Sequence, residues 1–472
     1  TLVFVFLIAR TLFGPVHALL AMLLAALMVL PIQLAHFFTA DTFATLFICA
    51  AVWWLIRERG PPGMVSLSLA SAVFALAVSC RIDMLLFGPV LLLAIIASAI
   101  QARPGWRSRL VHIAMLSMMV GLVFLVTLRL AMPSAFDGLL MPEARWLLNM
   151  RQISGLIEGE AAFPPGVQWT GRSSLTFALQ NLVVWGMGIP LGMAALAGMV
   201  IRGRQRWAVA GEDGRRLENL LMDRELLPWV WVALYLVMRG SGWVASMRYL
   251  LPLYPFFALF AGWCLTYCWQ RPGRASLRGG LRTVSVCVVV LTALWVTAFM
   301  HIYQQPHPRV AASNWIVDNL PKGSTLSSEY WDDSLPLYPI AAGSFAHVQM
   351  EPYREDDSEK PGLLVDWLDA VDYVVLSSNR LYASIPRQPL RYPLTSHFYR
   401  LLFTGQLGFE KAAEFAVYPT LGPLVFPDQE STRAMGLWPD PTRQRHDGEV
   451  IVPLPPAEEA FSVYDHPRVL IF

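Results

Sequence analysis

Ionisable side chains at the ends of long apolar stretches are the residues of this sequence best suited to chemistry. His36 and Asp41 occupy a short polar hairpin between two such stretches, and Arg81 and Asp83 make up most of another short turn. Charged groups at membrane depth are costly unless they face protein or water, so they are candidates for function. Asp41 is interpreted either as the N-cap of the helix that follows, or as a carboxylate in an outer cavity that binds a cation or sugar hydroxyls.

The turn around Arg81 also has two interpretations. Arg81 and Asp83 can form an ion pair that snorkels to the membrane interface. Alternatively, the guanidinium of Arg81 contacts a phosphate or pyrophosphate, a task for which its planar donors are well suited.

A third group combines charge with an interrupted helix. Arg248 and Tyr249 open an apolar segment whose first turns contain Pro252 and Pro255. Proline inside a helix removes a backbone hydrogen bond, and irregular backbone at membrane depth is tolerated only beside protein or a water-filled cavity. We therefore favour a functional role for this segment.

A weaker signal is the acidic-aromatic stretch EYWDD in the last third of the chain. Trp331 could serve as a stacking platform while Asp332 and Asp333 grip sugar hydroxyls. A solvated turn explains the same residue types.

The sequence offers no metal-binding or nucleotide-binding motif. Cys264 and Cys268 share a helix face, but no third ligand is near them. Walker, HExxH and GxSxG patterns are absent from the sequence. A net charge of only +2 also argues against a nucleic-acid partner. We predict no metal site among these residues.

The candidate residues must be positioned by membrane-spanning helices. The chain has 472 residues, of which 55% are hydrophobic and 15% charged, and its mean hydropathy is +0.47. Its apolar residues fall in blocks long enough to cross a hydrocarbon core of about 30 Å. We predict ten spans, the first incomplete: 1–9, 15–33, 42–56, 64–80, 84–100, 110–132, 180–201, 226–238, 249–268 and 283–303.

Arginines gather in every second connection between these spans, which predicts that those connections face the cytoplasm. The opposite connections are 34–41, 81–83, 133–179, 239–248 and the tail from 304. His36, Asp41, Arg81, Asp83 and Arg248 then share the outer face with the tail. We predict a multi-pass protein of the cell (plasma) membrane.

The composition predicts an all-α polytopic membrane protein with a C-terminal extracytoplasmic α/β domain. The membrane domain covers 1–303 and the outer domain 304–472. The outer loop 133–179 is too long for a simple connector, and its helical-looking part, 142–157, would lie along the membrane surface. In the tail we expect helices at 309–320, 362–370 and near 394–406, and strands at 324–328, 371–377, near 411–418 and near 461–471.

Several segments, in this order, resemble bacterial relatives of glycosyltransferase family 39, the dolichyl-phosphate-mannose–protein mannosyltransferases of GT-C fold. They are QLAHFFTADTFATLF, VQWTGRSSLTFALQNLVVWGMGIPLG, MRYLLPLYPFFALFAGW, RVAASNWIVDNLPKGS, EYWDD and YDHPRVLIF. The similarity spans nearly the whole chain, including the tail.

This resemblance implies a membrane glycosyltransferase that moves a sugar, with inversion, from a polyprenyl-phosphate donor to an acceptor hydroxyl of a protein, lipid or glycan on the outer face. The chemistry needs a carboxylate base for the acceptor and cations or hydrogen-bond donors for the departing phosphate. No cofactor is certain, and a divalent cation stays open.

The resemblance also suggests roles for particular residues. Asp41 looks like the family's second acidic position, and with His36 it is our candidate for catalysis. Arg81 stands where relatives commonly carry a lysine. Arg248 and Tyr249 resemble the family's Arg-Tyr pair, and these three residues are our candidates for phosphate binding. Asp83, with the tail residues Trp331, Asp332 and Asp333, is a candidate for sugar or acceptor contact.

The principal catalytic acid of the fold is expected in the first outer loop, upstream of Thr1. Activity would then require a segment that precedes this residue. Two other classes of protein remain open at this point. A secondary transporter also uses charges and broken helices, although its charges sit at mid-membrane. A non-catalytic membrane assembly protein would use the tail to bind a partner.

Overall fold

The computed structural model of the chain describes residues 1–472 except 103–104, 140, 161–163, 212–213, 341–342, 430–431, 438 and 444–446. The chain divides into two compact units. The helical unit comprises Thr1–Gly155 and Leu175–Val296, and the C-terminal unit comprises Leu156–Ser174 and Thr297–Phe472. The division thus lies near the expected one at 303/304. Part of the predicted outer loop, however, belongs to the C-terminal unit.

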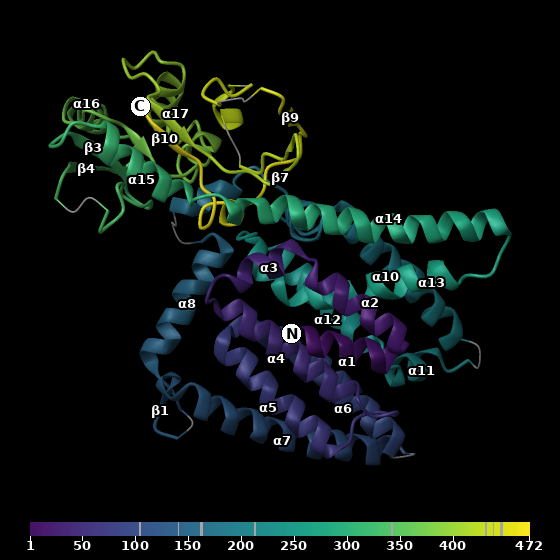
Figure 1. Ribbon diagram of the computed structural model, residues 1–472. Helices are drawn as coiled ribbons and strands as arrows, with labels where there is room; N and C mark the ends of the chain where they lie inside the picture. Colours follow the sequence, from purple (N-terminus) through teal and green to yellow (C-terminus); the bar gives the residue numbers. More distant parts are fainter. Residues whose placement is uncertain are drawn as a thin grey trace. The chain divides into compact units, whose positions relative to one another are not determined.

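Helices make up nearly all of the ordered elements up to residue 300 (Figure 1). A two-stranded antiparallel ribbon, β1 (Phe136–Asp137) and β2 (Met141–Pro142), interrupts them. The helices are α1 Leu2–Phe13, α2 Pro15–Ala26, α3 Val29–Ala35, α4 Ala40–Ile56, α5 Met64–Cys80, α6 Gly88–Ala102, α7 Trp106–Ala131, α8 Ala144–Glu158, α9 Ser174–Gln180, α10 Ile189–Ala210, α11 Arg216–Met222, α12 Leu226–Gly240, α13 Tyr254–Gln270 and α14 Ala275–Met300.

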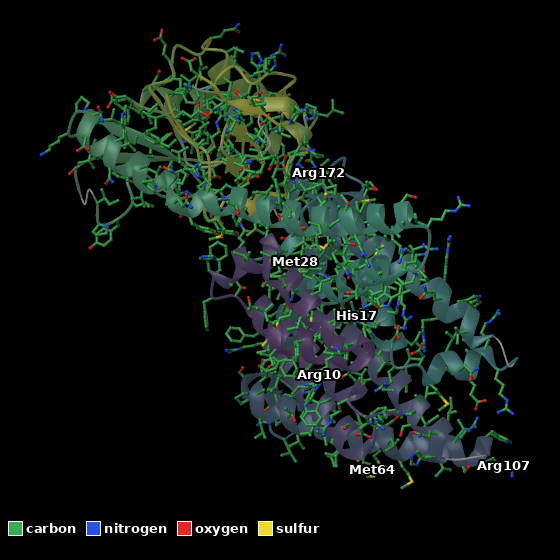
Figure 2. The ribbon with its side chains drawn as sticks, turned by 45° about the vertical axis from the view of Figure 1, so that its right-hand side comes forward. Arg10, His17, Met28, Met64, Arg107 and Arg172 are labelled. Carbon is green, nitrogen blue, oxygen red and sulfur yellow. The ribbon has the colours of Figure 1, made fainter. Side chains whose placement is uncertain are left out.

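All ten predicted spans coincide with apolar helical segments among the described residues. Four segments are long and apolar enough to cross a membrane: Ile82–Ala102, Trp106–Ala131, Met247–Gln270 and Ala275–Asn319. Two bent helix pairs bring the number to six if each is one span, and four shorter apolar helices match the remaining predictions. The multi-pass helical architecture is therefore confirmed. Figure 2 shows Met64 and Arg107 at one end of the helical unit, where two of the predicted inner connections lie.

Small residues let the central helix α13 approach its neighbours closely. A Cβ atom at Gly262 would lie 2.9 Å from the backbone nitrogen of Ala21 on α2. A Cβ atom at Gly198 of α10 would lie 2.2 Å from the carbonyl oxygen of Phe260. Helices in membranes associate through such close packing, because lipid provides little hydrophobic driving force. α13 is therefore held between α2 and α10.

The prolines after Arg248 act differently from the prediction. Residues Met247–Leu253 form a 3₁₀ turn that contains Pro252, and Pro255 lies in the first turn of α13, where its missing N–H costs nothing. Side chains of α12 reach the carbonyl groups of this turn. Trp231 Nε1 donates to Pro252 O at 3.3 Å, and Tyr235 Oη lies 2.9 Å from Tyr249 O. The irregular backbone at this depth is thus satisfied by neighbouring protein.

The C-terminal unit has the expected α/β character. Its helices are α15 Pro308–Asn319, α16 Lys360–Asp369 and α17 Pro393–Phe403. Strand β3 (Thr325–Glu329) pairs in parallel with β4 (Ala346–Met350). β10 (Val469–Ile471) lies between β5 (Val375–Leu376) and β6 (Ala413–Phe415), antiparallel to both. A third small sheet contains β7 (Thr420–Leu421), β8 (Leu424–Val425) and β9 (Val450–Ile451).

The buried strand β10 separates two hydrophobic clusters in this unit. Val469 and Ile471 pack in one cluster with residues of α15, while Leu470 packs in the other with residues of α17. This alternation is the period of two that a strand imposes on its side chains. The core of the C-terminal unit is therefore built around the last residues of the chain.

Candidate active site

Two short turns of the helical unit bring three of the predicted residues into contact. Asp41 is the second residue of α4, and Arg81 and Asp83 follow α5. The guanidinium of Arg81 contacts Asp41 Oδ1. It also donates from Nε to Asp83 Oδ1 at 3.0 Å and from Nη2 to Asp83 Oδ2 at 2.5 Å. Arg81 therefore bridges two carboxylates that lie far apart in the sequence.

The burial of these side chains decides between the earlier interpretations. Their exposed fractions are 8% for Asp41, 11% for Arg81 and 15% for Asp83. The N-cap of α4 is Thr39, so the carboxylate of Asp41 is used in an ion pair and not as a cap. The N-cap interpretation is therefore wrong for Asp41. The ion pair of Arg81 with Asp83, which one interpretation expected, is present and largely buried.

The sequence analysis missed two residues of α12 that complete this group. Arg239 Nε lies 3.2 Å from Asp83 Oδ2, and its side chain is 11% exposed. The hydroxyl of Tyr235, one helical turn earlier, lies 3.1 Å from the same Asp83 oxygen. The spacing of four residues places Tyr235 and Arg239 on one helix face. That spacing could have indicated both residues from the sequence, although the predicted span ended one residue before Arg239.

Tyr249 provides an aromatic surface on which the arginines converge. The guanidinium carbons of Arg81, Arg239 and Arg248 lie 4.5, 5.1 and 5.3 Å from the centre of its ring. Cations at this range are attracted to the ring face, more strongly where water is excluded. We call the following residues the arginine–tyrosine cluster: Asp41, Arg81, Asp83, Tyr235, Arg239, Arg248 and Tyr249.

Guanidinium groups gather in the arginine–tyrosine cluster. Arg81 and Arg239 contact the carboxylates of Asp41 and Asp83, and Arg248 adds a third guanidinium over the ring of Tyr249. Guanidinium groups present planar pairs of donors that match phosphate and carboxylate. Chemically, the arrangement is suited to contact an anion.

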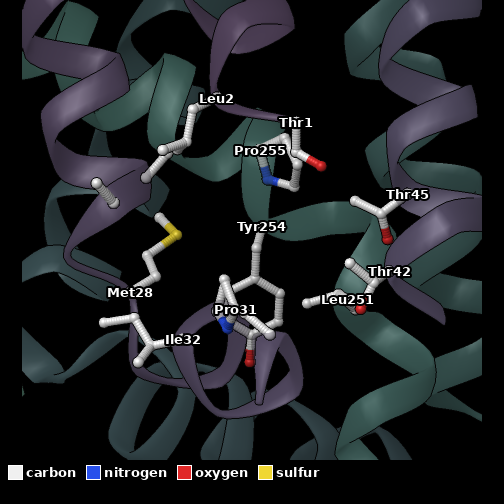
Figure 3. Close-up of a pocket in the computed structure, with 13 residues that line it drawn as sticks. Thr1, Leu2, Met28, Pro31, Ile32, Thr42, Thr45, Leu251, Tyr254 and Pro255 are labelled. Atoms are coloured by element: carbon white, nitrogen blue, oxygen red, sulfur yellow. The ribbon is translucent and has the colours of Figure 1, made fainter. Parts of the chain in front are cut away.

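An apolar cavity begins beside the cluster (Figure 3). It has a volume of about 280 Å³ and is lined from α2, α3, α4 and Leu251–Pro255. Figure 3 shows Thr42, Thr45 and Tyr254 around it. Thr45 Oγ1 donates to the carbonyl oxygen of Asp41 at 2.8 Å, so the cavity wall and the cluster share a turn of α4. The buried hydroxyl of Tyr254 has no hydrogen-bond partner among the described residues.

His36 is placed differently from the other candidates of the helical unit. It ends α3 and is exposed, and its Nδ1 lies 2.9 Å from the carbonyl oxygen of Ile32 on the same helix. A catalytic role for His36 stays a prediction.

The tail candidates Trp331, Asp332 and Asp333 belong to the C-terminal unit. Arg309 holds both carboxylates, with Nη2 at 2.6 Å from Asp332 Oδ1 and Nη1 at 2.7 Å from Asp333 Oδ2. Ser378 also donates to Asp332. Only 1% of the Asp332 side chain is exposed, against 61% for Asp333. The solvated-turn interpretation is therefore wrong for Asp332, which is an internal ion-pair partner.

Trp331 is fixed in an unusual backbone conformation. Its φ angle is +84°, a region that residues other than glycine rarely adopt. Arg380 Nη1 donates to its carbonyl oxygen at 2.5 Å. The side chains of Tyr330 and Trp331 are 47% and 38% exposed. An aromatic pair is thus held at the surface beside the accessible carboxylate of Asp333.

Glu329 begins the same EYWDD stretch and was not singled out from the sequence. Burial raises the pKa of Glu329 to about 8, although a hydrogen bond from Tyr399 acts in the opposite direction. Tyr399 Oη donates to Glu329 Oε1 at 2.5 Å, and Oε2 has no partner among the described residues. The first residue of the motif is therefore a buried carboxyl group that is largely protonated at neutral pH.

The part of the chain that the structure describes contains no ready set of metal ligands. No group of three or more His, Cys, Asp or Glu side chains comes together there. Asp41 and Asp83 both face the guanidinium of Arg81, which occupies the position that a cation would need.

Fold and site together define a multi-pass helical membrane protein with an α/β C-terminal unit. A cluster of charged residues at the ends of its helices lies beside an apolar cavity. Residues 1–127 match the model of the family described as dolichyl-phosphate-mannose-protein mannosyltransferase. This match confirms, for residues 1–127, the resemblance inferred from the sequence. The matched part contains Asp41, Arg81 and Asp83, whereas Arg239 and Arg248 lie beyond it.

Comparisons with other proteins give two structural likenesses and no curated relative. No curated protein matches the chain. The crystal structure of the Archaeoglobus fulgidus oligosaccharyltransferase in its apo form aligns with a TM-score of 0.49 at 13% identity. The oligosaccharyltransferase AglB of the same organism, in complex with an inhibitory peptide and a dolichol-phosphate, aligns with a TM-score of 0.43 at 13% identity. Each alignment covers 84% of this chain and 59% of the other, so the chain spans about three fifths of their length.

Proposed function

We propose that this chain is the body of a membrane glycosyltransferase that transfers a sugar from a polyprenyl-phosphate donor to an acceptor hydroxyl. The observation that carries the proposal is the convergence of three guanidinium groups on Tyr249 beside an apolar cavity. A polyprenyl phosphate combines the two matching features, an anionic phosphate and an apolar chain. The family match over residues 1–127 supports the same donor class.

In the proposed reaction, the acceptor oxygen forms a bond to the anomeric carbon while the bond from that carbon to the phosphate oxygen breaks. The phosphate leaves with the bonding electron pair, and a carboxylate takes the acceptor proton. A single displacement of this kind inverts the anomeric centre. Arg81, Arg239 and Arg248 would stabilise the charge that develops on the leaving phosphate, because fixed donors in a water-poor site act strongly there.

Asp41 and His36 are the proposed acid–base groups within the chain. The carboxylate of Asp41 is paired with Arg81, so a phosphate that binds Arg81 would compete for the guanidinium and release Asp41. We expect Asp41→Asn to lower the transfer rate more than the affinity for the donor. An unchanged rate would limit Asp41 to positioning Arg81.

The C-terminal unit would contribute contacts to the sugar or acceptor. Trp331 offers an exposed ring for stacking on a sugar face, and Asp333 offers an accessible carboxylate for hydroxyl groups. Asp332 would hold this surface in place through Arg309. In this proposal the unit lies outside the cytoplasm, at the cell membrane, and the acceptor is a protein, a lipid or a glycan.

Arg248→Ala in the full-length protein tests the proposed function. We expect transfer from a mannosyl polyprenyl phosphate to fall at least about 100-fold, because a donor to the leaving phosphate is lost. Arg151→Ala is the matched control, since Arg151 is an exposed arginine of α8 outside the cluster. Retained turnover in Arg248→Ala, with normal expression, would remove Arg248 from the site.

The same assay separates the proposal from a transporter. Asp41 lies in the first turn of α4, Arg81 directly after α5, and Arg239 in the last turn of α12. Charges at helix ends suit chemistry at the membrane surface better than transport through mid-membrane. Uptake of a sugar into proteoliposomes without any transfer would favour the transporter. The absence of both activities would favour an assembly protein.

A further inference from the structure

A second apolar groove lies at the other end of α13 from the arginine–tyrosine cluster. It is lined by residues of α2, α13 and α14 and has a volume of about 550 Å³. Leu19 and Leu23 of α2, Leu265 of α13, and Val286 and Val290 of α14 are among its lining residues. Tyr249 precedes α13, whereas this groove reaches Trp269 near its end. A helix of 17 residues is about 25 Å long, so the two sites are separate.

A row of arginines on α14 continues from this groove. Arg278 and Arg282 of α14, and Arg274 just before it, are exposed and follow one another at intervals of four residues. The same interval leads on to Val286 and Val290, which line the groove. Residues four apart are neighbours on a helix surface, and each such step turns by about 40°. The basic row and the apolar groove therefore form one continuous strip that winds along α14.

Trp269 marks the junction between the basic and the apolar parts. The guanidinium of Arg282 lies 5.3 Å from the centre of the Trp269 ring, and its Nε lies 3.4 Å from the Trp269 carbonyl oxygen. Trp269 itself lines the groove. Tryptophan is typical of the level at which a hydrocarbon core meets its headgroups. Arg282 is thus held against Trp269, a residue of the groove lining.

We infer that this strip binds one anionic phospholipid, with its phosphate at Arg278 and Arg282 and an acyl chain in the groove. Charge complementarity selects this occupant. A neutral lipid or a purely apolar helix would leave the arginine row without a counter-charge, and a soluble anion would make no use of the groove. Basic residues next to membrane helices attract anionic headgroups in this way. The site does not depend on the proposed transferase reaction.

The test uses the full-length protein, delipidated in detergent and titrated with phosphatidylglycerol or phosphatidylcholine of identical acyl chains. Native mass spectrometry counts the bound lipids. The double substitution Arg278→Gln with Arg282→Gln should weaken binding of the first phosphatidylglycerol roughly 30-fold, because each arginine near an anionic headgroup contributes about fivefold. The matched control is Arg107→Gln with Arg204→Gln, two exposed arginines outside the strip.

A second pair of variants tests the acyl-chain part. Val286→Trp with Val290→Trp fills the groove and should remove the tightly held lipid, whereas Val284→Trp with Leu291→Trp, at exposed positions outside the groove, should not. Equal affinity of the unmodified protein for the two lipids would overturn the inference. So would an equal loss in both arginine pairs, which would indicate general attraction to basic surface. Retention of a second polypeptide in the groove, with no lipid bound, would assign it to a helix instead.

Discussion

Buried charges are arranged differently in the two units. In the C-terminal unit two buried cations each meet two carboxylates: Arg468 pairs with Glu414 at 2.8 Å and Asp440 at 2.5 Å, and His466 pairs with Asp428 and Asp465 at 2.5 Å each. In the helical unit three guanidinium groups converge on the ring of Tyr249. One unit encloses these cations between carboxylates, and the other gathers its cations around an aromatic ring.

This difference separates charges that hold a fold together from charges that can receive a ligand. Burial alone would lower the pKa of His466, but Asp428 and Asp465 raise it to about 10, so this imidazole is charged at all physiological pH values. The arginine–tyrosine cluster gathers three guanidinium groups beside an apolar cavity. Such planar donors can bind an added anion.

Arg468→Met should have the largest effect and should damage stability, not binding. It leaves Asp440 buried without its cation and Glu414 paired with Lys411, at a cost of about 3–5 kcal/mol. We expect thermal unfolding of the full chain, followed by tryptophan fluorescence, to shift down by roughly 10 °C for the C-terminal transition.

The control for this change is Arg391→Met. Arg391 pairs with Glu355, and both side chains are about half exposed. An exposed ion pair contributes about 1 kcal/mol or less, so the unfolding temperature of the C-terminal unit should hardly change in Arg391→Met. An equal shift in the two variants would mean that burial of the Arg468 pairs is not what stabilises the unit.

Glu329→Gln should have a smaller effect that depends on pH. The pKa of Glu329 is raised from 4.5 to about 8 in the folded chain. The protonated carboxyl group of Glu329 contributes its full stabilisation of the fold below about pH 4.5, and this contribution is lost as pH rises toward 8. The native protein should therefore lose about 3 kcal/mol between pH 5 and pH 8, and Glu329→Gln should lose that much less.

Melting curves of the full chain at several pH values would measure this difference. Asp333→Asn, an exposed carboxylate of the same motif, is the control and should leave the pH dependence unchanged. If Glu329→Gln and the native chain had parallel profiles across this range, the buried carboxyl group would not titrate as the structure indicates.

The sequence predicted the helical architecture well because hydropathy acts over whole segments. It also marked Asp41, Arg81, Asp83 and Arg248, since a charge at the end of an apolar block is visible without any structure. It did not mark Tyr235, because a tyrosine inside an apolar helix looks like a packing residue. Only the fold shows that its hydroxyl reaches Asp83, 152 positions away in sequence.

The tail shows where local patterns were not enough. The local pattern indicated a turn residue at Asp332, yet its ion-pair partner Arg309 lies in α15, 23 positions earlier in the sequence. The strand expected near 461–471 is limited to Val469–Ile471, because Asp465 and His466 turn inward to form buried ion pairs. Strand β4 was not predicted, since the alternation of its apolar residues is weak. In each case a contact between distant segments overrides the local signal.

Binding of a short-chain polyprenyl phosphate to the full-length protein, compared with the corresponding polyprenol, tests the central claim most directly. The three convergent guanidinium groups predict that the phosphate binds at least about 30-fold more tightly than the alcohol. Arg239→Gln, which removes one of these guanidinium groups, should weaken phosphate binding roughly 10- to 100-fold and leave alcohol binding within about twofold. Equal affinity for phosphate and alcohol, or a phosphate affinity that Arg239→Gln does not change, would contradict the account.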